Sequence, residues 1–190
     1  MTSGVDLNAE VAKYVNPDHE NEELRVKDAA DALSGARDII AERISDHAEA
    51  RAALRKFFAE QSTVVSKVMF GKEKDEEAQK FRDYFDWSEP LKSIPSHRML
   101  AIRRGEKEGY LLMRIQPAED TAIKMIENLF VKGGNACTDQ MKLACADSYK
   151  RLLSSSMETE ARLESKKKAD TEAVRVFADN LRELLLAAPL

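Results

Sequence analysis

Two neighbouring side chains, Ser96 and His97, are the types that serve as a nucleophile and a general base. Acids such as Asp86 and Glu89 precede them and could orient the base. Adjacent residues point in different directions, however, and no glycine elbow exposes the serine. We therefore expect Ser96 to cap a helix that follows Pro95, with His97 in its first turn. No catalytic residue is predicted, and we expect the protein not to be an enzyme.

The sequence also gives no signal for a metal site or for a phosphate-binding loop. His97, Glu106 and Glu108 lie close in sequence, but there is no HExxH motif, no paired histidines and no acidic loop with ligand spacing. The glycines at 133–134 read as a helix end and lack the GxGxxG pattern of a phosphate-binding loop. The sequence predicts no metal, no cofactor and no small-molecule substrate.

A local concentration of positive charge is the strongest candidate site. Residues 91–115 carry a net charge of +4, whereas residues 72–90 carry −3. We expect a short helix from His97 to about Arg104, ended by Gly105, that follows a preceding helix and a tight turn in helix-turn-helix order. The predicted nucleic-acid-binding residues are Arg98, Arg103, Arg104 and Lys107. The alternative, a solvated helix end whose cations are favoured by the helix dipole, stays open.

Aromatic residues just before this segment could stack on nucleobases. Phe81, Tyr84, Phe85 and Trp87 follow the i, i+3, i+4 spacing of one helix face. We interpret them as core residues rather than as stacking platforms.

Helices must position these residues, because the composition favours helix. Charged residues make up 34% of the chain and there are only seven glycines among 190 residues. Apolar periodicity predicts helices over residues 28–46, 47–60 and 118–132, and another that follows Asn135. At Ser155 and Glu158 a capping-box spacing suggests that a new helix starts.

The last predicted helix is long. From residue 156 to 188 it would span about 50 Å, with a polar middle and then an apolar stripe at its end. The stripe comprises Val174, Phe177, Leu181, Leu184 and Leu185. Such a helix would bridge two modules, and we expect an elongated protein that continues beyond the final AAPL.

Two short segments break the helical pattern. Residues 63–71 are β-branched and end at Gly71, and residues 109–116 end at Pro117. The predicted fold class is mainly α: an elongated multi-helix bundle with a long C-terminal helix and a small two-stranded antiparallel β-ribbon in a helix-turn-helix-like part. We expect three successive parts, residues 1–62, 63–118 and 119–190.

The remaining features predict a cytoplasmic protein. The N-terminus lacks the basic start and apolar stretch of a signal peptide, and no run reaches the roughly 18 apolar residues of a membrane span. Cys137 and Cys145 lack CxxC spacing and read as reduced thiols.

The formal net charge of −4 gives no global field that would recruit nucleic acid or membrane, so any polyanion contact must be local.

Four blocks together resemble the Tex family of bacterial transcription accessory proteins. They are KFRDYFD (80–86), EPLKSIPSHRMLAIRRGEKEG (89–109), YKRLLSSSMETEAR (149–162) and AVRVFADNLRELLLAAPL (173–190), and ALSGARDIIAERISD (33–46) is similar to an earlier segment of the same family. The block around His97, Arg98, Arg104 and Gly105 is the most distinctive. Ser155 departs from the proline that is common there in the family.

The resemblance implies a central helical region without the ribonuclease-H-like, helix-hairpin-helix and C-terminal OB-type RNA-binding domains. It implies nucleic-acid binding, RNA or DNA, a role in transcription and no catalysis by this region, with RNA binding attributed chiefly to the OB-type domain. Our first hypothesis is a non-catalytic scaffold that binds nucleic acid weakly. The alternative is a protein-interaction module that docks RNA polymerase or the protein's own downstream domains.

Overall fold

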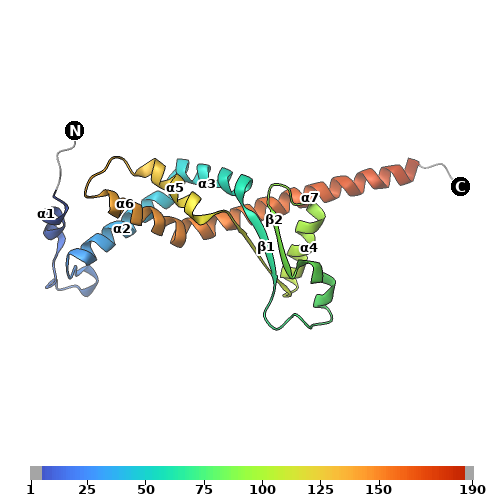
Figure 1. The fold of residues 1–190 in the computed structure, drawn as a ribbon, viewed down its shortest axis with the longest axis horizontal. Coiled ribbons are helices and arrows are strands. Elements are labelled where there is room, and N and C mark those ends of the chain that lie inside the picture. Colours follow the sequence, from blue (N-terminus) through green and yellow to red (C-terminus); the bar gives the residue numbers. More distant parts are fainter. Residues whose placement is uncertain (1–5, 187–190) are drawn as a thin grey trace. The chain divides into compact units, whose positions relative to one another are not determined.

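The computed structural model describes residues 6–186, and helices dominate it, which confirms the predicted mainly α class (Figure 1). The chain divides into two compact units. One combines the stretch up to Leu54 with Glu119–Ser156, and the other combines Arg55–Ala118 with the chain from Met157 onward. The three successive parts expected from the sequence stay a prediction.

The first unit is helical. Its elements are α1 (Leu7–Val11), the 3-10 helices η1 (Ala12–Tyr14) and η2 (Glu22–Leu24), α2 (Ala29–Ser45), the start of α3 (Ala48–Gln61), α5 (Glu119–Phe130), α6 (Thr138–Asp147) and the π-helical segment η4 (Ser148–Leu153). Asp28 caps α2, because its carboxylate accepts a hydrogen bond from the backbone N–H of Asp31 at 2.9 Å. Gly133, with φ +83°, lies in the turn that follows α5.

The core of this unit lies where α2 packs against α6 and η4. Ile44, Cys145 and Tyr149 are fully buried there. The hydroxyl of buried Ser148 donates to the backbone carbonyl of Ala41 at 2.8 Å, which satisfies a polar group inside the core. The predicted pair of helices on either side of Asp46 and the predicted helix after Asn135 are both confirmed.

A helix does begin beside Ser155, at Ser154, but the predicted N-cap is not formed. α6, η4 and α7 (Ser154–Leu186) follow one another without an intervening loop. Ser154 has φ −55° and ψ −51°, whereas an N-cap residue takes an extended conformation. The 33 residues of α7 confirm the predicted long C-terminal helix.

The second unit contains a three-stranded antiparallel sheet in the order β2-β1-β3 (Figure 1). Its strands are β1 (Thr63–Val68), β2 (Asp86–Pro90) and β3 (Leu111–Gln116). The predicted pairing of the two β-rich segments is confirmed, with Val65 opposite Arg114.

The predicted ribbon had two strands, whereas the sheet has three. The strand that was not predicted is β2. Phe81 and Tyr84 do lie in a helix, the 3-10 helix η3 (Ala78–Tyr84), but the chain then extends and pairs Ser88 with Val65. Trp87 therefore lies on a strand and not on the helical face expected for it. A five-residue strand of mixed polarity gives little sequence signal, because its hydrogen bonds to β1 decide its conformation.

The core of the second unit lies between the sheet and α4 (Ser96–Lys107). Side chains of β3 alternate between buried and exposed, as expected for a strand with one covered face. The core residues are Val64, Phe81, Met99, Ile102, Leu111, Met113, Ile115 and, from α7, Ala169. Within residues 6–186, no helix is long and apolar enough to cross a membrane.

Candidate nucleic-acid interface

The helix that carries the predicted site, α4, is longer than expected. It runs to Lys107, and Gly105 lies inside it rather than at its end. A Cβ atom on Gly105 would come within 2.6 Å of Leu111 Cδ1 and 3.1 Å of Phe81 Cδ1. Gly105 is therefore needed for the close packing of α4 on β3, while Gly109, with φ +78°, makes the turn into that strand.

The start of α4 also differs from expectation. Pro95 occupies the N-cap position without a side-chain cap, so Ser96 does not cap the helix and is its first residue. The element before α4 is strand β2, so the expected order of two helices joined by a tight turn is not found here. His97 is exposed. No cluster of three or more His, Cys, Asp or Glu side chains suited to a metal ion occurs within residues 6–186.

The four predicted residues do not share one face. At 100° per residue, Arg103, Arg104 and Lys107 fall within about 100° of one another on α4. Arg98 lies on a different side, close to the face that buries Met99. The structure thus brings three of the four residues together and separates the fourth.

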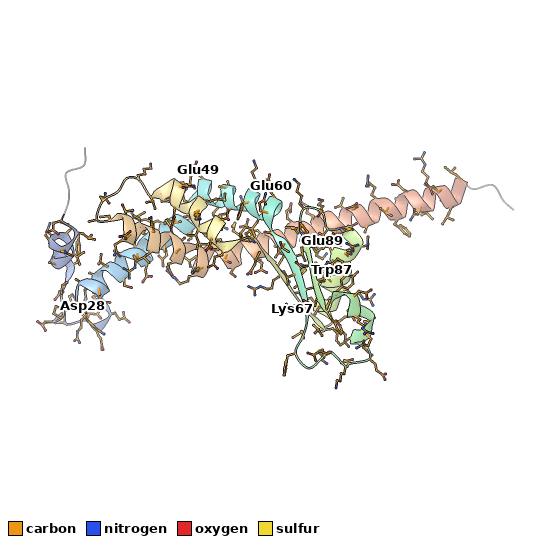
Figure 2. The ribbon with its side chains drawn as sticks, in the orientation of Figure 1. Asp28, Glu49, Glu60, Lys67, Trp87 and Glu89 are labelled. Atoms are coloured by element: carbon orange, nitrogen blue, oxygen red, sulfur yellow. The ribbon has the colours of Figure 1, made fainter. Side chains whose placement is uncertain are left out.

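Arg98 contacts two residues of strand β2, Trp87 and Glu89, which are labelled in Figure 2. Its Nη1 atom donates to Glu89 Oε2 at 2.9 Å, and its guanidinium lies 5.0 Å from the centroid of the Trp87 ring. About a third of the Arg98 side chain is exposed. Its ion pair and cation–π contact position it against the sheet, which makes it the least available of the four for a ligand.

Arg104 takes part in a surface cluster around Glu108. The Glu108 carboxylate accepts from Arg104 Nε at 2.7 Å and from Lys80 Nζ at 2.5 Å. The hydrogen bond from Lys80, followed by that from Arg104, lowers the pKa of Glu108 below its ordinary value. Arg104 is 69% exposed on its side chain, so its remaining guanidinium N–H groups face solvent.

We call the side of α4 that carries Arg103, Arg104 and Lys107 its outward face. Arg103 and Lys107 have few partners. Arg103 is half-buried and donates to the backbone carbonyl of Arg162 at 3.4 Å. Lys107 is exposed, and within the described part of the chain its side chain forms no hydrogen bond or ion pair. Its ammonium group is free to approach a phosphate.

An unexpected network holds α4 and β3 to helix α7. Buried Glu158 accepts from the backbone N–H of Ile115 at 2.9 Å, and Arg162 donates to the carbonyl of Met113 at 2.6 Å. Arg162 also pairs with Glu106 of α4 at 2.5 Å.

This network covers the open edge of the sheet. β3 has β1 on one side only, so alternate N–H and C=O groups of its other side need partners. Four residues of a helix rise about 6 Å, close to the roughly 6.8 Å between alternate residues of a strand. Glu158 and Arg162, four apart, therefore replace a neighbouring strand. Sequence reasoning placed Glu158 in a capping box with Ser155 and gave Arg162 no role, and a Glu–Arg pair at this spacing is more often an exposed pair within one helix.

Comparison with known proteins identifies the family. The family described as "Tex central region-like" matches residues 3–177. The chain belongs to this family. It is 35% identical to "Protein tex" of Bordetella pertussis and 37% identical to "Transcriptional accessory protein Tex" of Neisseria gonorrhoeae, each over 97% of the chain and 24% of the relative.

A more distant relative is human. The "S1 RNA-binding domain-containing protein 1" of Homo sapiens is 29% identical over 66% of the chain and 13% of its own length. The chain spans about a quarter of the length of the bacterial relatives named above. It is therefore a Tex-like family member whose match covers only the central part of those proteins.

Proposed function

We propose that this chain is a non-catalytic scaffold region of a Tex-like transcription accessory protein and that it contacts the phosphate backbone of nucleic acid. The contact residues are Arg103, Arg104 and Lys107 on the outward face of α4. Arg98 belongs to the same proposal as a contact from the β2 side of the helix, and its ion pair with Glu89 makes it the weakest of the four.

One observation carries the proposal: three cationic side chains, the exposed Arg104 and Lys107 and the half-buried Arg103, share one side of a helix that is anchored by its other side. Met99, Ile102 and Gly105 are buried against the sheet, so α4 cannot turn to bury its cations. The chain as a whole is acidic, with a formal net charge of −4, so attraction of a polyanion depends on this local face. The names of the relatives, which refer to transcription and RNA binding, agree with this.

Phosphate contacts of this kind give affinity without sequence preference. The test is fluorescence anisotropy of a labelled 20-nucleotide single-stranded RNA with the 190-residue chain at about 50 mM salt. We expect replacement of Arg103, Arg104 and Lys107 by alanine to weaken binding at least about tenfold. The matched control replaces Lys166, Lys167 and Lys168, three exposed residues of α7, by alanine and removes the same charge.

The control should change binding by less than about twofold. Equal losses in the two triple variants would reduce the effect to net charge and remove the α4 face from the proposal. Unchanged binding in the α4 variant would do the same. A labelled duplex DNA measured in parallel gives the preference between the two nucleic acids.

A second function is favoured by the exposed apolar residues near the end of α7. Val174, Phe177 and Leu185 are each about 70% exposed, and Leu181 is 43% exposed. Large apolar side chains repeated along one helix face are typical of a docking surface. In this alternative the chain is a protein-interaction module for RNA polymerase or for the protein's own downstream domains. Pull-down of polymerase that persists after serine replaces all four residues would count against it.

A further inference from the structure

The second unit has a long groove that neither function above uses. It runs along α7 and is bordered by the end of α3, the 91–96 loop and the start of α4, with a volume of about 1130 Å³. Phe58, Met99 and Met157, which are almost fully buried, lie beneath its floor, and the half-buried Leu91 and Ile94 line the loop side. All of the lining residues belong to this one unit.

The rim of the groove is basic. Its charged residues are five basic side chains and three acidic ones, a net charge of +2 on a chain whose formal net charge is −4. Arg55 donates to Glu160 at 2.8 Å, which occupies one of the acids. Lys92, Lys168 and Arg175 are among the remaining cations. An apolar floor beneath a basic rim is complementary to a ligand with apolar and acidic groups.

The size of the groove indicates what kind of ligand it would bind. Small-molecule sites enclose about 300–1,000 Å³, and this groove is larger. Its lining on α7 extends from Met157 to Arg175, which corresponds to about 27 Å along the helix axis. That length matches five turns of a second helix lying beside α7, the geometry in which an amphipathic helix places its apolar face in a groove.

We propose that this groove binds an acidic amphipathic helix of about 18 residues from a partner protein. The apolar face of that helix packs on the half-buried Leu91 and Ile94 and on Leu163, and its carboxylates pair with Lys168 and Arg175. Leu163, which lines the groove and is 63% exposed, becomes covered in the complex. The proposal does not rest on nucleic-acid binding by α4, since it uses none of the same residues.

The test uses a defined probe: an 18-residue fluorescent peptide with leucine at helical spacing and alanine and glutamate elsewhere. A matched peptide has lysine in place of each glutamate. Titration with the 190-residue chain, followed by anisotropy, is expected to show saturable binding of the glutamate peptide, at least about tenfold tighter than that of the lysine peptide. Equal affinities would overturn the proposal.

Paired variants on α7 locate the binding. Leu163→Ser is expected to weaken binding of the glutamate peptide about five- to tenfold, whereas Leu184→Ser, at an exposed leucine outside the groove, should leave binding unchanged. Lys168→Glu should weaken it by a similar factor, and Lys166→Glu, on the opposite side of the helix, should not. These four positions are exposed, so the variants should fold, and a circular dichroism spectrum checks this for each.

Other occupants give different results, and each would overturn the proposal. If a 20-nucleotide uridine homopolymer displaces the peptide and its own binding needs Lys168 but not Leu163, the groove is a nucleic-acid site. If sedimentation shows a dimer that Leu163→Ser abolishes, a second copy of the chain occupies the groove. If the α4 variant binds RNA as tightly as the wild type, the proposed nucleic-acid contact is refuted, but the peptide-binding results for the groove are not affected.

Discussion

The edge network of α7 leads to a quantitative prediction about Glu158. This residue is 7% exposed, and its carboxylate accepts the backbone N–H of Ile115 from the open side of β3. Glu158→Ala removes the only acceptor that this N–H has among the described residues. A buried donor without a partner costs about 1–3 kcal/mol.

Two weaker contacts add to this cost: a hydrogen bond that Gln116 Nε2 donates to Glu158 Oε2 at 3.4 Å, and an ion pair with Arg114. Arg114 Nε lies 3.3 Å from Glu158 Oε1, and the Arg114 side chain is 55% exposed, so solvent screening limits that ion pair to about 0–1 kcal/mol. Glu158→Ala should therefore destabilise the second unit by about 1–4 kcal/mol. Glu158→Gln retains an amide oxygen in the acceptor position and should cost about 1 kcal/mol or less.

The assay combines urea unfolding, followed by circular dichroism, with hydrogen exchange measured on a peptide that covers β3. The chain has two compact units, so exchange of the Ile115 amide reports the local effect even if unfolding is not two-state. We expect faster exchange across β3 in Glu158→Ala and no change in α2.

The matched control is Glu164→Ala, which removes an exposed glutamate from the same helix and should cost less than about 0.5 kcal/mol. Wild-type exchange across β3 in Glu158→Ala would refute the idea that α7 replaces a neighbouring strand. Equal destabilisation by the alanine and glutamine variants would show that charge, and not the acceptor position, is what matters.

Three further predictions concern single positions. Gly105→Val should destabilise the second unit by about 1–3 kcal/mol in thermal melts, because its side chain would collide with buried Leu111; a melt like that of the wild type would contradict the close approach. Burial, and then the charge of Glu127, raises the pKa of Cys145 to about 11, so its thiol should be neutral at pH 8 and react with a disulfide reagent far more slowly than an unfolded cysteine. The pKa of Glu108 is lowered in the folded protein, so the stability that this carboxylate contributes is present above its unfolded pKa and is lost as pH falls through the folded pKa. In an NMR titration, Lys80→Ala should move the pKa of Glu108 upward. An unchanged pKa would exclude the ion pair between Lys80 and Glu108 in solution.

The helices were largely predictable, because their apolar residues repeat with helical periodicity. The pairing of β1 with β3 followed from two β-branched segments that needed a partner. Strand β2 could not be predicted in this way. Trp87 follows Tyr84 at a spacing that also suits a helix, and only the pairing with β1 determines that this segment is a strand.

Residues of the site show the same limit. Sequence alone located the cations of α4, but not that Arg98 pairs with Glu89 while Lys107 remains available. Gly105 looked like a helix stop, because glycine commonly ends helices, and its role in close packing depends on Leu111 from a distant strand. The burial of Glu158 is likewise a property of tertiary contacts.

The most direct test of the proposed function is the salt dependence of RNA binding. Three phosphate contacts to a single strand predict a slope of about −2 in a plot of log K against log salt concentration, which corresponds to about a 20-fold loss between 50 and 200 mM. Replacing Arg103, Arg104 and Lys107 by alanine should leave a slope between zero and about −0.7, the value for a single remaining contact from Arg98. A slope near −2 that survives in this variant would contradict the proposal that the outward face of α4 binds the phosphate backbone.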